Sequence, residues 1–194
     1  YSDIRGVSGQ TAIFGLQLGT GSLTMQIGGM VSGDVVAYNS ANGKDLTIST
    51  GVYSRISTSN RGIYARNYST DGSLSVTVDG DIRAGDSGIF VRNLSQNVNI
   101  ATGTDSDING LAGSGIHVIH DGAGDVSISA NGDILGYRGI YAISSANSND
   151  IHIETGADSA ITTTGGHGIE TINNSAAGGT SITIGAPVSG CLIV

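Results

Sequence analysis

The stretch IRAGDSGIFVRNLSQNVNIATGTDSDINGLAGSGI, residues 82–116, decides the fold of this chain. A Gly-Ile pair, Gly88-Ile89, opens a run of alternating apolar residues, and Gly115-Ile116 begins the same cycle again. Between the pairs lie a second run, Val98-Asn99-Ile100, and a third around Ile108. Each run is short, rich in Ile and Val and bounded by turn residues, which is typical of β-strands.

The same cycle of three apolar runs repeats along the whole chain. A period of this size, with insertions confined to turns, predicts a solenoid or another repeat array. Three strands in about 26 residues are too few for a propeller blade, which needs roughly 40 residues and four strands. They suit one coil of a parallel β-helix. The apolar residues that open each cycle are Ile13, Val35, Ile63, Ile89, Ile116, Ile140, Ile169 and Leu192.

The sequence therefore predicts an all-β chain that folds as a parallel β-helix of about seven coils, with three short strands per coil. A longer motif, Ile-x-Thr-Gly-x-x-Ser-x-Ile, starts at Ile48, Ile100 and Ile153 and indicates duplication of a two-coil unit. Because the repeat is continuous, we expect residues 1–194 to form one domain. The last repeat stops just after Leu192, which would leave an uncovered strand edge, so we expect a fragment of a longer protein.

Composition agrees with a solenoid and excludes several classes of function. We expect the 32 glycines, with Asn, Asp and Ser, to supply positive-φ and side-chain-bonded positions in the turns. The net charge of −8, with eight Lys and Arg, argues against a nucleic-acid partner. No apolar run approaches the roughly 18 residues of a membrane span. The single cysteine, Cys191, cannot form an intrachain disulfide. A low cysteine count fits a secreted bacterial protein as well as a cytoplasmic one.

One residue after the opening apolar position of each coil, the side chains are mostly aromatic. Side chains alternate between the faces of a strand, so this column points outward if Ile63, Ile89 and Ile140 point inward. Such a column can bind a sugar, a peptide or a receptor surface, or it can merely stabilise neighbouring strands. The column reads Phe14, Val36, Tyr64, Phe90, His117, Tyr141 and Glu170. The predicted binding face is Phe14, Tyr64, Phe90, His117 and Tyr141.

A second column, four residues after the opening position, is rich in Asn. Asn side chains in successive coils can bond to one another and to turn groups, so we interpret this column as structural. It reads Gln17, Asn39, Asn67, Asn93, His120, Ser144 and Asn173. His120 substitutes for Asn within it, and His117, three residues away on one strand, faces the opposite side. We therefore expect no metal site from the histidines.

A third column is acidic and precedes the third apolar run. It contains Asp81, Asp107 and Asp133. Carboxylates stacked about 5 Å apart raise one another's pKa and could bind a cation or act as an acid and base pair. Asp is also favoured in turns such as Asp79-Gly80-Asp81, where it simply faces water. The basic residue expected near this column is Arg83.

These coils resemble the passenger domains of autotransporters, which are virulence proteins of Gram-negative bacteria. The resemblance rests on Gly88-Ile89-Phe90-Val91-Arg92-Asn93 and Gly139-Ile140-Tyr141-Ala142, on the Ile-x-Thr-Gly-x-x-Ser-x-Ile motif and on Gly-Asp-Ile. It covers residues 13–194, and its motifs are architectural. It implies a right-handed parallel β-helix that is secreted or held on the bacterial surface. Passengers of this kind act mostly by contact, and any protease domain is an inserted module that this chain lacks.

We therefore expect a non-enzymatic virulence factor that binds a host cell-surface protein, matrix or glycan, or engages a host receptor after release. Self-association is a further option. Nothing indicates a cofactor, and we expect no membrane insertion by these residues. One alternative is a β-helix polysaccharide lyase or hydrolase that uses Asp81, Asp107 and Asp133. Another is a structural stalk that displays a functional tip located elsewhere.

Overall fold

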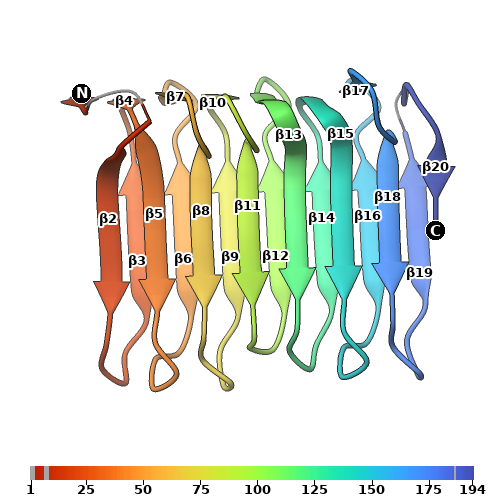
Figure 1. Cartoon of the computed structure of the whole chain (residues 1–194), viewed down its shortest axis with the longest axis horizontal. Helices are drawn as coiled ribbons and strands as arrows, with labels where there is room; N and C mark the ends of the chain where they lie inside the picture. The colour runs from red at the N-terminus through yellow and green to blue at the C-terminus, as the bar shows by residue number, and fades with distance from the viewer. Residues whose placement is uncertain (1–2, 7–8, 186) are drawn as a thin grey trace.

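The computed structural model describes residues 3–6, 9–185 and 187–194, all of which lie in strands, turns or irregular connections. The chain winds into a continuous rod whose ends carry the two termini (Figure 1). It descends on the near side and rises on the far side as it advances toward the C-terminus, so the coil is right-handed (Figure 1). The described residues contain no helix that could cross a membrane. The predicted all-β, parallel β-helix of about seven coils is confirmed.

Each coil adds one strand to each of three parallel ladders, named here the first, second and third ladder. The first ladder contains β2 (Thr11–Gln17), β5 (Asp34–Asn39), β8 (Ile63–Asn67), β11 (Ile89–Asn93), the end of β13 (Asp107–His120), the end of β15 (Asp133–Ser144), β18 (Ile169–Asn173) and β20 (Leu192–Ile193). The second contains β3 (Leu23–Ile27), β6 (Leu46–Thr50), β9 (Leu74–Val78), β12 (Val98–Thr102), β14 (Val126–Ala130), β16 (Ile151–Thr155) and β19 (Thr180–Ile184). The third contains β1 (Ile4–Arg5), β4 (Met30–Ser32), β7 (Arg55–Thr58), β10 (Asp81–Ala84), the starts of β13 and β15, and β17 (Ile161–Thr163).

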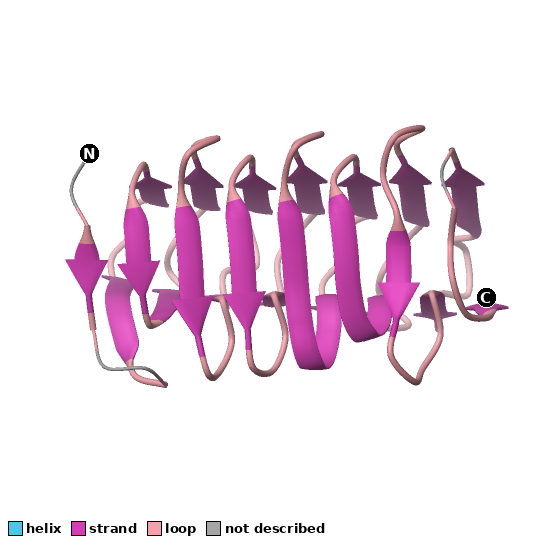
Figure 2. Cartoon of the chain, turned by 90° about the horizontal axis from the view of Figure 1, so that it is seen from above, coloured by secondary structure: helices cyan, strands magenta, loops and turns pink. Residues whose placement is uncertain are grey.

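Two strands, β13 and β15, belong to both the third and the first ladder. They run around the corner between these ladders without a break, and two long bent ribbons are visible there in Figure 2. Their mutual pairing is irregular only between Gly110 and Ser114, where the chain turns. In the other coils the same corner is a short turn. Because β13 and β15 pair in both ladders, the third and first ladders form one continuous sheet.

The interior is a column of stacked aliphatic side chains. In β6, β9 and β14 buried residues alternate with half-buried ones, as expected for strands with one face in a core. The register sets Ile63 opposite Ile89 and Ile89 opposite Ile116, which is the register that the sequence spacing predicts. Equivalent residues of successive coils therefore form straight columns both inside and outside the rod.

The glycine of the Gly-Ile pair is required by close packing. A β-carbon on Gly88 would lie 2.6 Å from Cγ2 of Ile108, and one on Gly115 would lie 2.2 Å from Cγ2 of Ile134. The same close approach recurs at Gly62, Gly139 and Gly168. In the described residues, positive φ occurs only at Gly9, Gly33 and Gly190. The expectation that glycine supplies positive-φ turn positions therefore holds at these three residues only, and at the start of each coil glycine instead admits the third-ladder side chain.

Candidate functional site

A row of six rings runs along the outer face of the first ladder in the described part of the chain. Neighbouring ring centroids lie 4.6 to 5.8 Å apart, and four of the five contacts are edge-to-face. From the N-terminal end, this aromatic row consists of Phe14, Tyr38, Tyr64, Phe90, His117 and Tyr141. The structure thus brings all five residues of the predicted binding face together in one row.

Tyr38 is the member of the row that sequence reasoning missed. Val36 occupies the register position opposite Tyr64, as the predicted column required. Its side chain is too short to bridge the neighbouring rings, and Tyr38, two residues further along β5, points to the same face. Its ring centroid lies 5.6 Å from that of Phe14 and 5.8 Å from that of Tyr64. Burial, followed by the neighbouring Tyr64, raises the pKa of Tyr38.

The aromatic row is unequally exposed along its length. Phe14 is 55% exposed, whereas Phe90 is only 9% exposed because its neighbours cover it. The other four rings are half-buried. Each edge-to-face pair contributes about 0.5–1.5 kcal/mol beyond its buried area, so the row stabilises the solenoid whether or not it binds a ligand.

Arginine side chains cover parts of the row. The Cζ atom of Arg61 lies 4.7 Å from the ring centroid of Tyr64 and 4.4 Å from that of Phe90. Arg138 lies 4.3 Å from Tyr141 in the same way. Sequence reasoning missed these cations although a signal existed. The tetrapeptide Arg-Gly-Ile-Tyr occurs at 61–64 and again at 138–141, and in both copies the arginine lies over the tyrosine.

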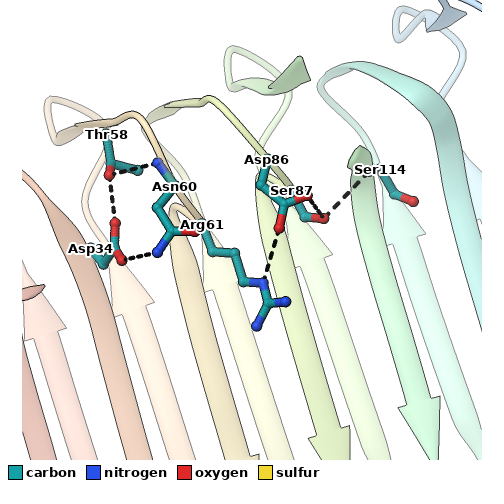
Figure 3. Close-up of polar contacts among 7 residues, drawn as sticks. All are labelled: Asp34, Thr58, Asn60, Arg61, Asp86, Ser87 and Ser114. Atoms are coloured by element: carbon teal, nitrogen blue, oxygen red, sulfur yellow. Dashed lines mark hydrogen bonds and ion pairs between the residues drawn. The ribbon is translucent and has the colours of Figure 1, made fainter. Parts of the chain in front are cut away.

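Polar contacts at the corner between the third and first ladders hold Arg61 in place (Figure 3). Its Nε atom lies 3.1 Å from Oδ2 of Asp86, one coil further on. The hydroxyl of Ser87 donates to Oδ1 of Asp86 at 3.5 Å, and the Ser114 N–H donates to Ser87 Oγ at 3.4 Å. These contacts join three successive coils and fix the guanidinium above the rings.

The same corner contains a buried carboxylate one coil earlier. Asp34 accepts hydrogen bonds from the Thr58 hydroxyl and, at 2.8 Å, from Nδ2 of Asn60 (Figure 3). The Asn60 N–H donates to the Thr58 hydroxyl oxygen at 3.1 Å. A buried carboxylate is tolerated when its oxygens are hydrogen-bonded in this way. The network fixes the turn that immediately precedes Arg61.

Arg138 is held by an acid in the following coil. Its Nε atom lies 2.9 Å from Oε2 of Glu170, which is the register partner of Tyr141. Glu170 was the last member of the predicted outward column. It therefore ends the aromatic row with a carboxylate, which anchors the arginine that covers the last ring.

His117 lies between the two arginines. Burial, reinforced by the positive charges of Arg138 and Arg61, lowers the pKa of His117 to about 4. The imidazole is therefore neutral at pH 7. Its Nε2 atom is buried and has no hydrogen-bond partner among the described residues. Although the chain carries a net charge of −8, the two arginines make this part of the face locally unfavourable for a further cation.

An open hollow of about 220 Å³ lies beside His117. Both arginines and Asp86 line it, together with the rings of Phe90 and Tyr137. Ser87 and Ser114 add hydroxyl groups to its wall. Aromatic surface, charge and hydroxyls thus meet at one point of the first-ladder face.

The Asn column lies at the corner between the first and second ladders. Asn39, Asn67 and Asn93 are fully buried, and Asn39 Nδ2 donates to Asn67 Oδ1 at 2.9 Å. Asn173 accepts from the Ser144 hydroxyl at 2.7 Å. The column is interrupted, because Asn67 Nδ2 and Asn93 Oδ1 lack hydrogen-bond partners in the described part of the chain.

His120 takes a place in this column. Its Nε2 atom lies 3.2 Å from the Gly124 carbonyl oxygen, and its Nδ1 atom lies 3.3 Å from Asn93 Nδ2. The carbonyl can only accept and the amide nitrogen can only donate, so the neutral tautomer with hydrogen on Nε2 satisfies both contacts. Burial lowers the pKa of His120.

The acidic column lies on the outer face of the third ladder. Asp107 pairs with Asp133 in register. Asp81 lies 3.0 Å from Nη2 of Arg55 and accepts the Asp107 N–H at 3.3 Å. Asp133 accepts the Ala160 N–H at 2.8 Å. Two of the three carboxylates thus bond the backbone of the following coil, as turn residues do.

Asp107, the middle member of this column, has a raised pKa. Burial, then the charges of Asp81 and Asp133, raise the pKa of Asp107. A hollow of about 230 Å³ beside it is lined by Arg83 and also by Arg55. Arg83 was the basic residue predicted here, and Arg55 is a second that the prediction passed over.

No three His, Cys, Asp or Glu side chains come together as a possible metal site within residues 3–6, 9–185 and 187–194. Cys191 is exposed and forms no disulfide with any described residue. No protein-family model, curated protein or solved structure matches this chain. The family to which the chain belongs is therefore not shown, and the resemblance to autotransporter passengers stays a prediction.

Proposed function

We propose that this chain is a non-enzymatic binding domain, secreted or displayed on a bacterial surface in the manner of an autotransporter passenger. In this proposal it contacts a host cell surface, either a protein, matrix or a glycan, through the first-ladder face. The aromatic row supplies the apolar part of that face, and Arg61 and Arg138 supply its cations.

The observation that carries the proposal is the concentration of rings on one outer face. A solenoid needs apolar residues only at its inward positions, because these alone fill the core. Aromatic residues and arginine are enriched at protein interfaces, where they act as anchors. The aromatic row and its arginines combine both kinds of residue on one outer face across six successive coils.

The test is binding of the purified, labelled chain to cultured mammalian cells. The first-face variant is Tyr38→Ser, Tyr64→Ser and Tyr141→Ser, which leaves the nearly buried Phe90 in place. The matched second-face variant is Thr47→Ala, Ser75→Ala and Ser127→Ala, at outward positions of β6, β9 and β14. Circular dichroism must show intact β-structure for each protein.

We expect saturable binding by the wild-type chain and the second-face variant, and at least a tenfold loss in the first-face variant. Equal binding by the two variants would contradict the assignment of the face. Non-saturable background for all three proteins would instead support a structural stalk.

The polysaccharide lyase or hydrolase is retained as a second candidate because Asp107, with its raised pKa, lies beside Arg55 and Arg83. Asp81 and Asp133 weaken this candidate, since both carboxylates are engaged by other groups. Release of reducing ends or unsaturated products from uronate polymers, lost in Asp107→Asn, would establish it. Absence of turnover by the wild-type chain would eliminate it.

A further inference from the structure

The hollow beside His117 has an excess of positive charge. Of the charged side chains that line it, Arg61 and Arg138 are cations and Asp86 is an anion. His117 adds no charge at pH 7, because its pKa is lowered to about 4. The lining itself therefore carries a net single positive charge, and Glu170, the acid that balances it, lies outside the lining 2.9 Å from Nε of Arg138. An anionic group that enters the hollow thus meets the cations directly.

Both arginines have donors left for such a ligand. The Nε–H of Arg61 donates to Asp86, and the Nε atom of Arg138 lies 2.9 Å from Oε2 of Glu170. A guanidinium carries five N–H donors in a planar fork, so contact through Nε leaves the terminal nitrogens able to bond a carboxylate in bidentate fashion. The acids thus fix the direction of each arginine without using up its donors.

The ring of Tyr137 offers a stacking surface at the edge of the hollow. It is 48% exposed, and it lies against a turn that contains Gly165 and Gly166. A β-carbon on Gly165 would lie 2.6 Å from Cε2 of this ring, so only glycine leaves the ring where it is. An exposed tyrosine ring held in this way can stack on the apolar face of a sugar, because the face of a tyrosine ring is apolar while the tyrosine hydroxyl is polar.

We propose that this hollow binds a sugar residue that bears a carboxylate, of the sialate or uronate type, within a surface glycan. Arg138 binds the carboxylate, and the sugar ring packs on the neighbouring Tyr137. Ser114, the register partner of Arg138, offers its hydroxyl to the sugar. The volume of about 220 Å³ lies below the roughly 300–1,000 Å³ of drug-sized pockets and suits one sugar ring. The inference rests on the proposed function and names its ligand class.

The test is a titration of the full chain, followed by NMR of the arginine side chains or by calorimetry, with three probes. These are 3′-sialyllactose, a hyaluronan tetrasaccharide that contains glucuronate, and neutral lactose. We expect at least one acidic probe to bind at least tenfold more tightly than lactose. The acidic probe that binds identifies the sialate or the uronate as the source of the carboxylate.

Variants locate the site. Arg138→Gln and Gly165→Ala should each weaken the acidic probe at least tenfold, the first by loss of donors and the second by displacement of the Tyr137 ring. Lys44→Gln, which removes an exposed cation from the turn before β6, should leave binding unchanged. Lactose binding as tightly as both acidic probes, or an unchanged affinity in Arg138→Gln, would overturn the inference.

Failure of this inference is distinguishable from failure of the proposed function. If no saccharide binds while the first-face variant still loses its binding to cells, the hollow is not a sugar site and the proposed function stands. If neither the saccharides nor the cells distinguish the variants from the wild-type chain, both proposals fail.

Discussion

The first and second ladders share one aliphatic core, but the side chains on their outer faces differ. In β8 and in β9 the fully buried residues are aliphatic except for Asn67 at the end of β8, and they alternate with half-buried outward residues. Outward from the first ladder lie the aromatic row and four of the eight Lys and Arg residues. These four are Arg61, Arg66, Arg92 and Arg138. The second-ladder strands contain no Lys or Arg and turn outward mainly Ser, Thr and Asn.

The comparison of the two faces shows which outward residues the solenoid needs for folding and which it does not. Because the core takes side chains from inward positions only, the second-ladder face shows that short polar residues suffice on the outside. The rings and arginines of the first-ladder face are therefore additional to the needs of the solenoid. They stabilise one another, and they form the surface to which we assign binding.

The largest expected effect tests the shared interior. Ile89→Ala in the first ladder and Ile100→Ala in the second should each lower the free energy of unfolding by about 2–5 kcal/mol, because both remove buried methyl and methylene groups and leave a cavity. Urea unfolding followed by circular dichroism measures both. A cost confined to one ladder would contradict the view that the two faces share one core.

The next effect compares outward residues of a single coil. Phe90→Ala should cost about 3 kcal/mol, near the lower end for a buried phenylalanine, because its ring packs against Tyr64 and His117. Asn99→Ala, at an exposed outward position of β12, should stay within about 0.5 kcal/mol. Equal costs in urea unfolding would show that the aromatic row adds no stability.

The pH dependence of stability tests whether the surroundings of His117 lower its pKa. Its neighbours are the rings of Phe90 and Tyr141 and the charged side chains of Arg61, Arg138 and Asp86. Its pKa is lower in the folded chain than in the unfolded chain, so the unfolded state binds the proton first. The contribution of His117 to the free energy of unfolding is therefore fully present above about pH 6.5. It decreases as the pH falls toward 4, by up to about 3 kcal/mol in total.

The variant His117→Gln should remove this part of the slope in urea unfolding between pH 7.5 and 4. His120 will keep its own contribution, because burial also lowers the pKa of His120. An unchanged slope in His117→Gln would mean that the imidazole titrates normally and that the two arginines do not act on it.

The smallest expected effect concerns the arginines. Arg138→Gln removes a cation–π contact and a half-buried ion pair, each worth on the order of 1 kcal/mol, so the free energy of unfolding should fall by about 1–2 kcal/mol. Ser129→Ala on the second-ladder face should be close to neutral. A loss of several kcal/mol would show that Arg138 is a structural residue and would make it unsuitable for the binding test.

The sequence predicts the columns of this molecule better than the contacts within them. The Gly-Ile spacing predicts the register, because every inward position must align in a narrow core. Tyr38 was missed because the aromatic column was defined as the residue one position after the opening apolar residue of each coil, which in β5 is Val36. Val36 is short, and the longer outward side chain of Tyr38 fills the space between the neighbouring rings. Arg61 and Arg138 were missed because they lie at the corner between the third and first ladders, outside the columns that were followed. The partners of Asp81 and Asp133 come from other coils, whose spatial relation depends on turn conformation.

The measurement that tests the central claim most directly places a large blocking group on one face or the other of the same coil. In a Cys191→Ser background, Arg92→Cys and Asn99→Cys put one exposed thiol on the first-ladder or the second-ladder face, and each is coupled to a bulky polyethylene glycol maleimide. Both uncoupled variants must first bind cells as the wild-type chain does. We predict that coupling at residue 92 abolishes binding and that coupling at residue 99 leaves it intact. Binding that survives at 92, or is lost equally at both positions, would contradict the assignment of the first-ladder face.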